Sequence, residues 1–300
     1  MAKPHIKMSF SIMIRRIHTS ALKHFNRWVF GGHRPDFLIV GAQKCGTTSL
    51  FSYLDERDAF RGATPKEVHY FDRDDNFRRG NNWYESHFLH RIGKNSLFFE
   101  ASPTYFCREK VPARLRAFNP NLKFIVILRE PISRAHSAWN MYRQWSEEGF
   151  VPWGIRNDQY GRKESPLFQV FFKNGCPAFS DYIKLEMDLI AKCDSQEEPS
   201  LLRRGLYKPQ IERYVELFGW DSILVLGFSE LKEDSEAVIR KCYEFLDVPY
   251  RAASDKGEMK IKNKRSYPSK MSNENLEILK EFYEQPNREL FDYLGFQPDW

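Results

Sequence analysis

A short loop with two glycines and one lysine is the first group of residues in this chain that could do chemistry. It reads GAQKCGTTSL over residues 41–50, follows the apolar run FLIV at 37–40, and precedes apolar residues at helical spacing from Leu50 onward. At the start of such a helix, amide groups without a helical partner and the positive end of the helix dipole face the solvent or a ligand. The pattern therefore predicts an anion site, and phosphate is the leading candidate, with Lys44 inside the loop.

The loop differs from both common nucleotide-binding motifs. Gly41 and Gly46 have the spacing of a P-loop, but Thr47 stands where the nucleoside triphosphate motif has its lysine. We find no acidic residue at a strand end that suits the magnesium ion of kinase chemistry, and the three glycines of a dinucleotide site are missing. A kinase or ATPase is therefore the weaker alternative. The loop favours a cofactor with one 5′-phosphate and an anionic leaving group, and we expect no metal.

The composition is that of an ordinary globular protein. The chain has 300 residues, of which 42% are hydrophobic, and this is long enough to bury one large core. The net charge of +6 is moderate, so it suits an anionic cofactor without predicting a nucleic-acid partner. The five cysteines are widely spaced with no CxxC pair, which predicts neither a disulfide framework nor a zinc site.

The first 35 residues differ from the rest of the chain. They are basic and contain no acidic residue, since the first one is Asp36. We interpret residues 1–35 as a basic N-terminal extension and residues 36–300 as the catalytic domain. The apolar run at 12–14 is too short to span a bilayer, so we expect no transmembrane anchor and a soluble, cytoplasmic protein. Organelle targeting, a membrane-surface helix and a solvated tail stay open for the extension.

From Asp36 onward, short apolar runs alternate with helical periodicities. This order predicts an α/β protein with a P-loop-like three-layer fold, in which helices flank a central parallel sheet. The expected strands are residues 37–40, 124–128 and 223–226, with a weaker candidate at 97–99.

Three helices have clear signals. One covers about 207–218 and stops at Gly219, and a second follows a cap at Asp234 or Ser235. A third starts near Ser272 and is expected to be interrupted at Pro286. Residues 145–180 have no clear period, and we interpret them as a long excursion from the sheet.

The sequence PDFLIVGAQKCGTTSL at 35–50 resembles the 5′-phosphosulfate loop of the sulfotransferase superfamily. The resemblance is nearest to the heparan sulfate sulfotransferase group and its soluble relatives, and it covers roughly residues 36–295. It implies a sulfuryl transfer from 3′-phosphoadenylyl sulfate to a hydroxyl or amine of a carbohydrate or small molecule. The alternatives are the kinase or ATPase above and a non-catalytic nucleotide-binding relative. The loop residues that would bind the donor are Lys44, Cys45, Gly46, Thr47, Thr48 and Ser49.

Other blocks of the resemblance imply further cofactor contacts. The sequence LREPISRAHS at 128–137 is similar to the family's 3′-phosphate site, with Arg129 and Ser137 as the two contacts. The blocks RGLY at 204–207 and NKRSYP at 263–268 resemble late cofactor contacts and imply Tyr207, Lys264 and Arg265. For Tyr207, an ordinary place in the core of its helix is an equal alternative.

The segment PKEVHYFD at 65–72 resembles the part of the family that carries the general base. The resemblance implies Glu67 in this role, because an attacking hydroxyl must lose a proton and a carboxylate of raised pKa can accept it. His69 would share a strand face with Glu67, so it could orient the base or replace it. Lys44 would neutralise the charge that develops on the leaving phosphate oxygen.

Two positions depart from the heparan sulfate pattern. Ala101 stands after Glu100 where those enzymes usually have lysine, and Lys264 occupies a glycine position. These departures leave the sulfotransferase prediction in place but question a heparan-type acceptor. The sequence assigns neither the acceptor nor the oligomeric state.

Overall fold

The computed structural model describes residues 32–89, 96–152, 154–156, 164–192, 198–251, 271–298 and 300. Within them the chain forms a five-stranded parallel sheet in the order β2-β3-β1-β4-β5. The strands are β1 (Phe37–Gly41), β2 (Phe60–Gly62), β3 (Leu97–Ala101), β4 (Lys123–Leu128) and β5 (Ile223–Gly227). The four predicted strands are confirmed. β2 was not predicted, because its three residues FRG contain no apolar run.

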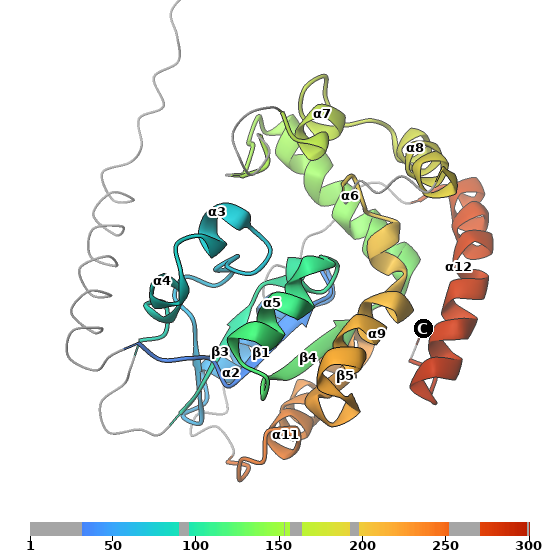
Figure 1. The fold of residues 1–300 in the computed structure, drawn as a ribbon. Coiled ribbons are helices and arrows are strands. Elements are labelled where there is room, and N and C mark those ends of the chain that lie inside the picture. Colours follow the sequence, from blue (N-terminus) through green and yellow to red (C-terminus); the bar gives the residue numbers. More distant parts are fainter. Residues whose placement is uncertain are drawn as a thin grey trace, which may run out of the picture.

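Helices cover both faces of this sheet, which confirms the three-layer α/β fold (Figure 1). On one face are α2 (Thr47–Asp55), α10 (Phe228–Glu233) and α11 (Ser235–Phe245), and on the other are α5 (Lys110–Phe118) and α9 (Tyr207–Phe218). The contacts are aromatic in part: the ring of Phe124 on β4 lies 5.1 Å from that of Tyr214 on α9. Gly219 ends α9 with a positive φ of 79°, and Asp234 caps α11, both as predicted.

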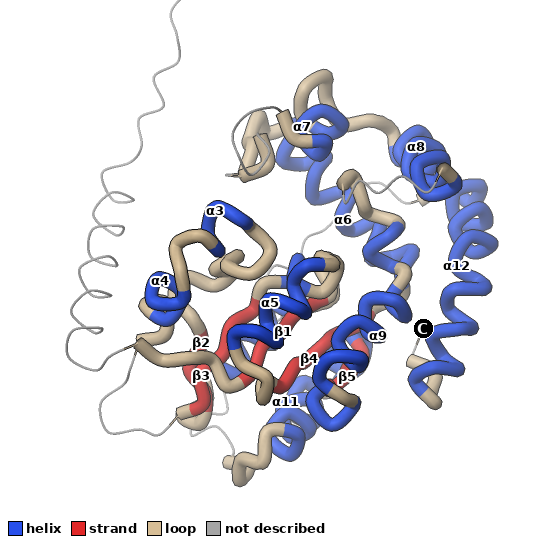
Figure 2. Tube along the Cα trace, in the orientation of Figure 1, coloured by secondary structure: helices blue, strands red, loops and turns tan. Residues whose placement is uncertain are grey.

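A second group of helices extends beyond the sheet (Figures 1 and 2). It contains α6 (Pro131–Glu147), α7 (Pro166–Phe171), α8 (Phe179–Ala191) and α12 (Asn273–Leu294). These helices share a hydrophobic cluster of their own, separate from the cluster around the sheet. The predicted excursion at 145–180 therefore includes regular structure. Its residues Phe171 and Phe179 belong to the core of this group, and Phe171 stacks on Tyr142 of α6 at 4.7 Å.

The predicted interruption of the last helix is wrong. Ser272 caps α12 as expected, but the helix continues through Pro286 to Leu294. A proline removes one backbone hydrogen bond, and packing on both sides of it compensates for that loss. Tyr283 before the proline and Leu290 after it are each 1% exposed.

The remaining elements are short. They are α3 (Asp74–Phe77), α4 (Asn81–Glu85) and the 3-10 turns η1 (Pro103–Tyr105), η2 (Arg203–Gly205) and η3 (Trp220–Ser222). In the part of the chain that the structure describes, none of the helices is both long enough and apolar enough to cross a bilayer. The predicted boundary between an extension and the domain lies next to residues 1–31, which are outside the described ranges.

Parallel strands bring the loops that follow them to one edge of the sheet. The loop after β3 passes over the end of β1, where the amide of Phe106 donates to the carbonyl of Val40 at 3.0 Å. A side chain on Gly41 would place its Cβ only 2.5 Å from the Cβ of Phe106. This close contact requires glycine at the start of the phosphate loop.

We predict that Gly41→Ala lowers the free energy of unfolding by about 1–3 kcal/mol, because the added methyl group forces Phe106 and the β1 end apart. Urea unfolding of the single variant measures the loss. The double variant Gly41→Ala/Phe106→Gly, which also removes the Cβ of Phe106, should lose less than the sum of the two single losses. Strict additivity in this cycle would contradict the proposed clash.

Candidate active site

The loop between β1 and α2 has the geometry of an anion site. Lys44 and Gly46 both have positive φ values, 70° and 90°, and Gly46 is the residue before the helix. A Cβ on Gly46 would lie 3.0 Å from side-chain atoms of Leu231 and Phe228, so the loop needs glycine there. Thr47, the first helical residue, is 4% exposed. The turn directs the first amide groups of a nine-residue helix to the carboxyl edge of the sheet.

Arg129 is brought to this loop from the neighbouring strand. β4 pairs with β1, and Arg129 follows β4 directly. Its Nη1 donates to the carbonyl of Lys44 at 3.2 Å, and its guanidinium lies 4.9 Å from the ring centre of Phe228. The hydroxyl of Tyr207 donates to the carbonyl of Arg129 at 2.7 Å. Lys44 and Arg129, predicted from separate motifs, therefore lie side by side.

Several predicted cofactor residues have buried side chains. Cys45 is 0% exposed, and burial raises the pKa of its thiol to about 11. Ser49 and Tyr207 are also buried, at 3% and 1% exposed, whereas Thr48 is half-buried. Cys45 and Ser49 can therefore reach a ligand through their backbone more readily than through their side chains, and Tyr207 supports Arg129.

The structure describes one of the remaining predicted cofactor residues but not the other two. Ser137 lies on α6, two turns from its start, and is 6% exposed. Lys264 and Arg265 lie outside the described residues, so their predicted contacts with the nucleotide stay predictions.

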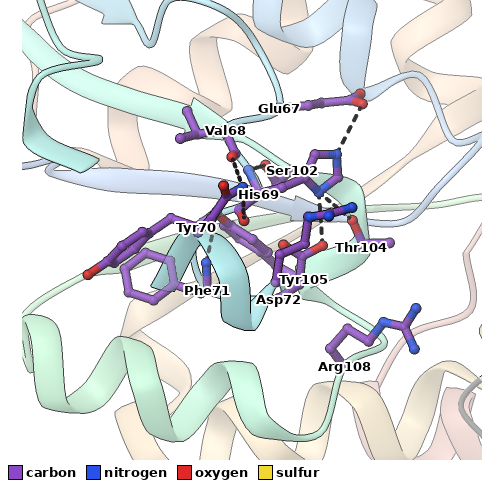
Figure 3. A network of polar contacts seen from close by, with 12 residues as sticks. Glu67, Val68, His69, Tyr70, Phe71, Asp72, Ser102, Thr104, Tyr105 and Arg108 are labelled. Atoms are coloured by element: carbon purple, nitrogen blue, oxygen red, sulfur yellow. Dashed lines mark hydrogen bonds and ion pairs between the residues drawn. The ribbon is translucent and has the colours of Figure 1, made fainter. Parts of the chain in front are cut away.

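The segment after β2 brings Glu67, His69 and Asp72 together (Figure 3). The His69 ring lies between two carboxylates, with Nδ1 2.9 Å from Asp72 Oδ2 and Nε2 3.8 Å from Glu67 Oε2. Lys66 Nζ donates to Glu67 Oε1 at 2.6 Å. The expectation of a shared strand face is wrong: the segment is a loop, and Glu67 and His69 both have positive φ, 65° and 53°. The loop nevertheless places the two side chains in contact.

The charges of this group stabilise one another. Burial works to raise the pKa of Glu67, but the contacts with His69 and Lys66 outweigh it and lower that pKa to about 2. Burial also works against protonation of His69, but the Asp72 carboxylate and then Glu67 raise the pKa of the ring to about 10. At neutral pH, Glu67 is ionised and His69 is protonated. The expected raised pKa of the base is therefore wrong for Glu67, because the sequence analysis placed His69 nearby but did not show that Asp72 would keep its ring protonated.

A buried carboxyl group on β3 is linked by hydrogen bonds to the loop that carries His69. Glu100 on β3 is 0% exposed and accepts hydrogen bonds from the hydroxyls of Ser102, Tyr105 and Tyr84. Burial raises its pKa. Ser102 Oγ in turn accepts from the amide of His69 at 3.3 Å.

Sequence reasoning assigned no role to these supporting residues. Asp72 was inside the quoted motif, and its spacing of three residues from His69 was a usable signal. Thr104 Oγ1 lies 3.2 Å from His69 Nδ1, and Tyr105 accepts the amide of Tyr70 at 2.8 Å. Both come from a distant part of the chain, so no local pattern could have predicted these contacts. Among the described residues, no three His, Cys, Asp or Glu side chains group as metal ligands would.

Comparisons with known proteins agree with this architecture. The family model for the sulfotransferase domain matches residues 34–291, so the chain belongs to the sulfotransferase domain family. In structure, the chain is similar to a sulfotransferase from Alicyclobacillus acidocaldarius, with a TM-score of 0.64 and 24% identity over 88% of this chain and 97% of that one. This likeness supports the fold.

Curated relatives are longer than this chain, and the match covers a smaller share of their length. The chain is 22% identical to the membrane-associated sulfotransferase kil1 of Dictyostelium discoideum, over 89% of this chain and 66% of that protein. It is 26% identical to human heparan sulfate glucosamine 3-O-sulfotransferase 5, over 72% of this chain and 54% of that protein. The chain thus spans about half to two thirds of the length of these relatives. The family match favours the sulfotransferase prediction over a kinase or ATPase.

We predict that Asp72→Asn lowers the pKa of His69 toward its ordinary value of 6.5, since it removes the charge that contributes most to the raised value of about 10. NMR titration of the ring measures this shift. A raised pKa in the folded state adds stability that is complete below pH 6.5 and is lost as the pH rises through about 10. The stability difference between wild type and Asp72→Asn should therefore be larger at pH 6.5 than near pH 10. An unchanged ring pKa would contradict this assignment.

Proposed function

We propose that this protein transfers a sulfuryl group from 3′-phosphoadenylyl sulfate to a hydroxyl or amine of an acceptor. The observation that carries the proposal is the convergence of two motifs: Arg129 donates a hydrogen bond to the backbone of Lys44 at the start of α2. The family match adds the class of chemistry. A cationic residue, a glycine turn and a helix N-terminus together suit an anionic donor.

In this proposal the loop binds the 5′-phosphate end of the donor. Backbone groups of residues 45–49 would contact the phosphate, and Lys44 would neutralise the charge that grows on the leaving oxygen. Arg129 and Ser137 would bind the 3′-phosphate, with Tyr207 holding the backbone of Arg129. Lys264 and Arg265 would complete the nucleotide site.

The proposed general base is Glu67. Its side chain is 43% exposed, so an acceptor can reach it. A pKa of about 2 keeps it ionised but makes it a weak base, so it would take the proton only as the transfer proceeds. His69 is a poorer candidate, because a ring with a pKa of about 10 already holds its proton at neutral pH. His69 would instead orient Glu67 by its positive charge.

The proposed acceptor is a carbohydrate or a small molecule. Several relatives are named for heparan sulfate glucosamine, but Ala101 and Lys264 depart from the pattern of that group. We also propose that the protein acts in the cytoplasm, since no apolar anchor was predicted from its sequence. The name of the Dictyostelium relative, a membrane-associated sulfotransferase, makes cell fractionation the direct test.

We predict that Arg129→Ala weakens the binding of adenosine 3′,5′-bisphosphate far more than the binding of adenosine 5′-phosphate, because the guanidinium would contact the 3′-phosphate. Calorimetry with both ligands measures the two losses, and ATP with magnesium serves as the comparison for a kinase. Equal losses for both ligands would remove Arg129 from the 3′-phosphate site. Tighter wild-type binding of ATP than of the bisphosphate would contradict the proposed function.

We predict that Glu67→Gln lowers kcat by a factor of about 10² to 10⁴ and leaves bisphosphate binding intact, because glutamine cannot accept the proton. Transfer of labelled sulfuryl groups to a panel of sugars, phenols and amines supplies the assay. His69→Ala serves as the matched variant in the same loop and should cost less. If Glu67→Gln turns over normally and His69→Ala is inactive, His69 and not Glu67 would be the general base.

A further inference from the structure

The connection between α8 and α9 carries a buried cluster of charged side chains that the proposed chemistry does not use. Glu198 and Arg204 are 8% and 4% exposed. Glu198 Oε1 accepts from Arg204 Nη2 and from Arg108 Nη2, the latter at 2.8 Å. Ser200 Oγ donates to Glu198 Oε2 at 2.7 Å and accepts from Arg204 Nε at 3.0 Å. One carboxylate thus pairs with two guanidinium groups.

Burying such a cluster of charged side chains costs free energy. Buried charges lose their hydration, and an apolar set of the same volume is often as stable or more stable. Burial works to raise the pKa of Glu198, but Arg204 and Arg108 outweigh it and lower that pKa. The carboxylate is therefore kept ionised by its partners, and the geometry of all three side chains is tightly determined.

The third guanidinium nitrogen of Arg204 reaches the phosphate loop. Arg204 Nη1 donates to Gln43 Oε1 at 2.8 Å. Gln43 directly precedes Lys44, whose carbonyl accepts from Arg129. Consecutive residues of the loop are thus held by two arginines, one through a side chain and one through the backbone.

The segment that carries Arg204 is itself fixed by the helical group. Glu186 on α8 accepts from the amides of Leu202 and Arg203 at 2.8 Å each. Tyr283 on α12 donates to the carbonyl of Leu202, also at 2.8 Å. The backbone next to Arg204 therefore has little freedom, and the helices beyond the sheet are connected to the loop through this side chain.

We propose that Arg204 and Glu198 are positioning residues that fix the phosphate loop through Gln43. Arg204 acts on the loop without touching the donor, and Glu198 orients Arg204. This inference rests on the proposed function of the loop as the site of the 5′-phosphate.

The test compares the two ends of the donor. Gln43→Met removes the acceptor of Arg204, and Arg204→Met leaves Glu198 still paired with Arg108. Each variant should lower the affinity for adenosine 5′-phosphate by about tenfold and leave the affinity for adenosine 3′-phosphate unchanged, as measured by calorimetry. The double variant should lose no more than either single variant, because both break the same link.

A control is available in another ion pair with a buried arginine. Arg57 is 6% exposed and donates to Glu236 at 2.6 Å, at the opposite end of α2 from the loop. Arg57→Met should lower the melting temperature without changing the affinity for either monophosphate. This variant separates general destabilisation from positioning of the loop.

Two outcomes with the variants would overturn the inference alone. One is that Gln43→Met binds adenosine 5′-phosphate as tightly as the wild-type protein does. Because Gln43→Met tests the same link, the experiment remains decisive even if Arg204→Met fails to fold. The other is an equal loss of affinity for both monophosphates, which would indicate general destabilisation. If the wild-type protein binds no adenosine 5′-phosphate, the proposed donor site itself is wrong and the inference with it. The wild-type and variant results thus distinguish the two failures.

Discussion

The hydrogen bond from Arg129 to the carbonyl of Lys44 is the contact on which the arrangement of the site depends. It joins the loops after β1 and β4, two neighbouring parallel strands at the centre of the sheet. Ligands of open α/β sheets bind at such a point, because the chain leaves the two strands in different directions. A shift of either strand would separate the two cationic residues, so the register of the buried sheet determines the geometry of the proposed donor site.

Much of the fold could be predicted from the sequence, because its central strands are buried on both faces and appear as continuous apolar runs. The exceptions have physical reasons. β2 is a short edge strand with the sequence FRG, which no apolar pattern indicates. The helix through Pro286 depends on packing on either side of the proline, and this packing involves residues far away in the sequence. Local signals predict the start and the end of an element better than they predict such tertiary compensation.

The candidate site could be predicted only in part for the same reason. Lys44 and Arg129 belong to local motifs, and the structure brings them together. The link from Arg204 to Gln43 joins residues 161 positions apart, and no spacing rule indicates it. The ionisation of Glu67 was also out of reach, since it depends on the protonated His69 ring and therefore on Asp72 behind that ring. Motifs thus indicate candidate site residues, whereas distant partners decide their charge and position.

The two sides of the proposed site carry different kinds of charged groups, and the proposed reaction would use both. On the base side, Lys66 and His69 are balanced by Glu67 and Asp72. On the donor side, Lys44 and Arg129 lie at the positive end of a helix. Sulfuryl transfer moves negative charge from the acceptor to the leaving phosphate and leaves a proton behind. The proton would pass to the side that holds an ionised carboxylate, and the negative charge to the side with two cationic residues and a helix N-terminus, so nearby charges would favour both movements in the proposed reaction.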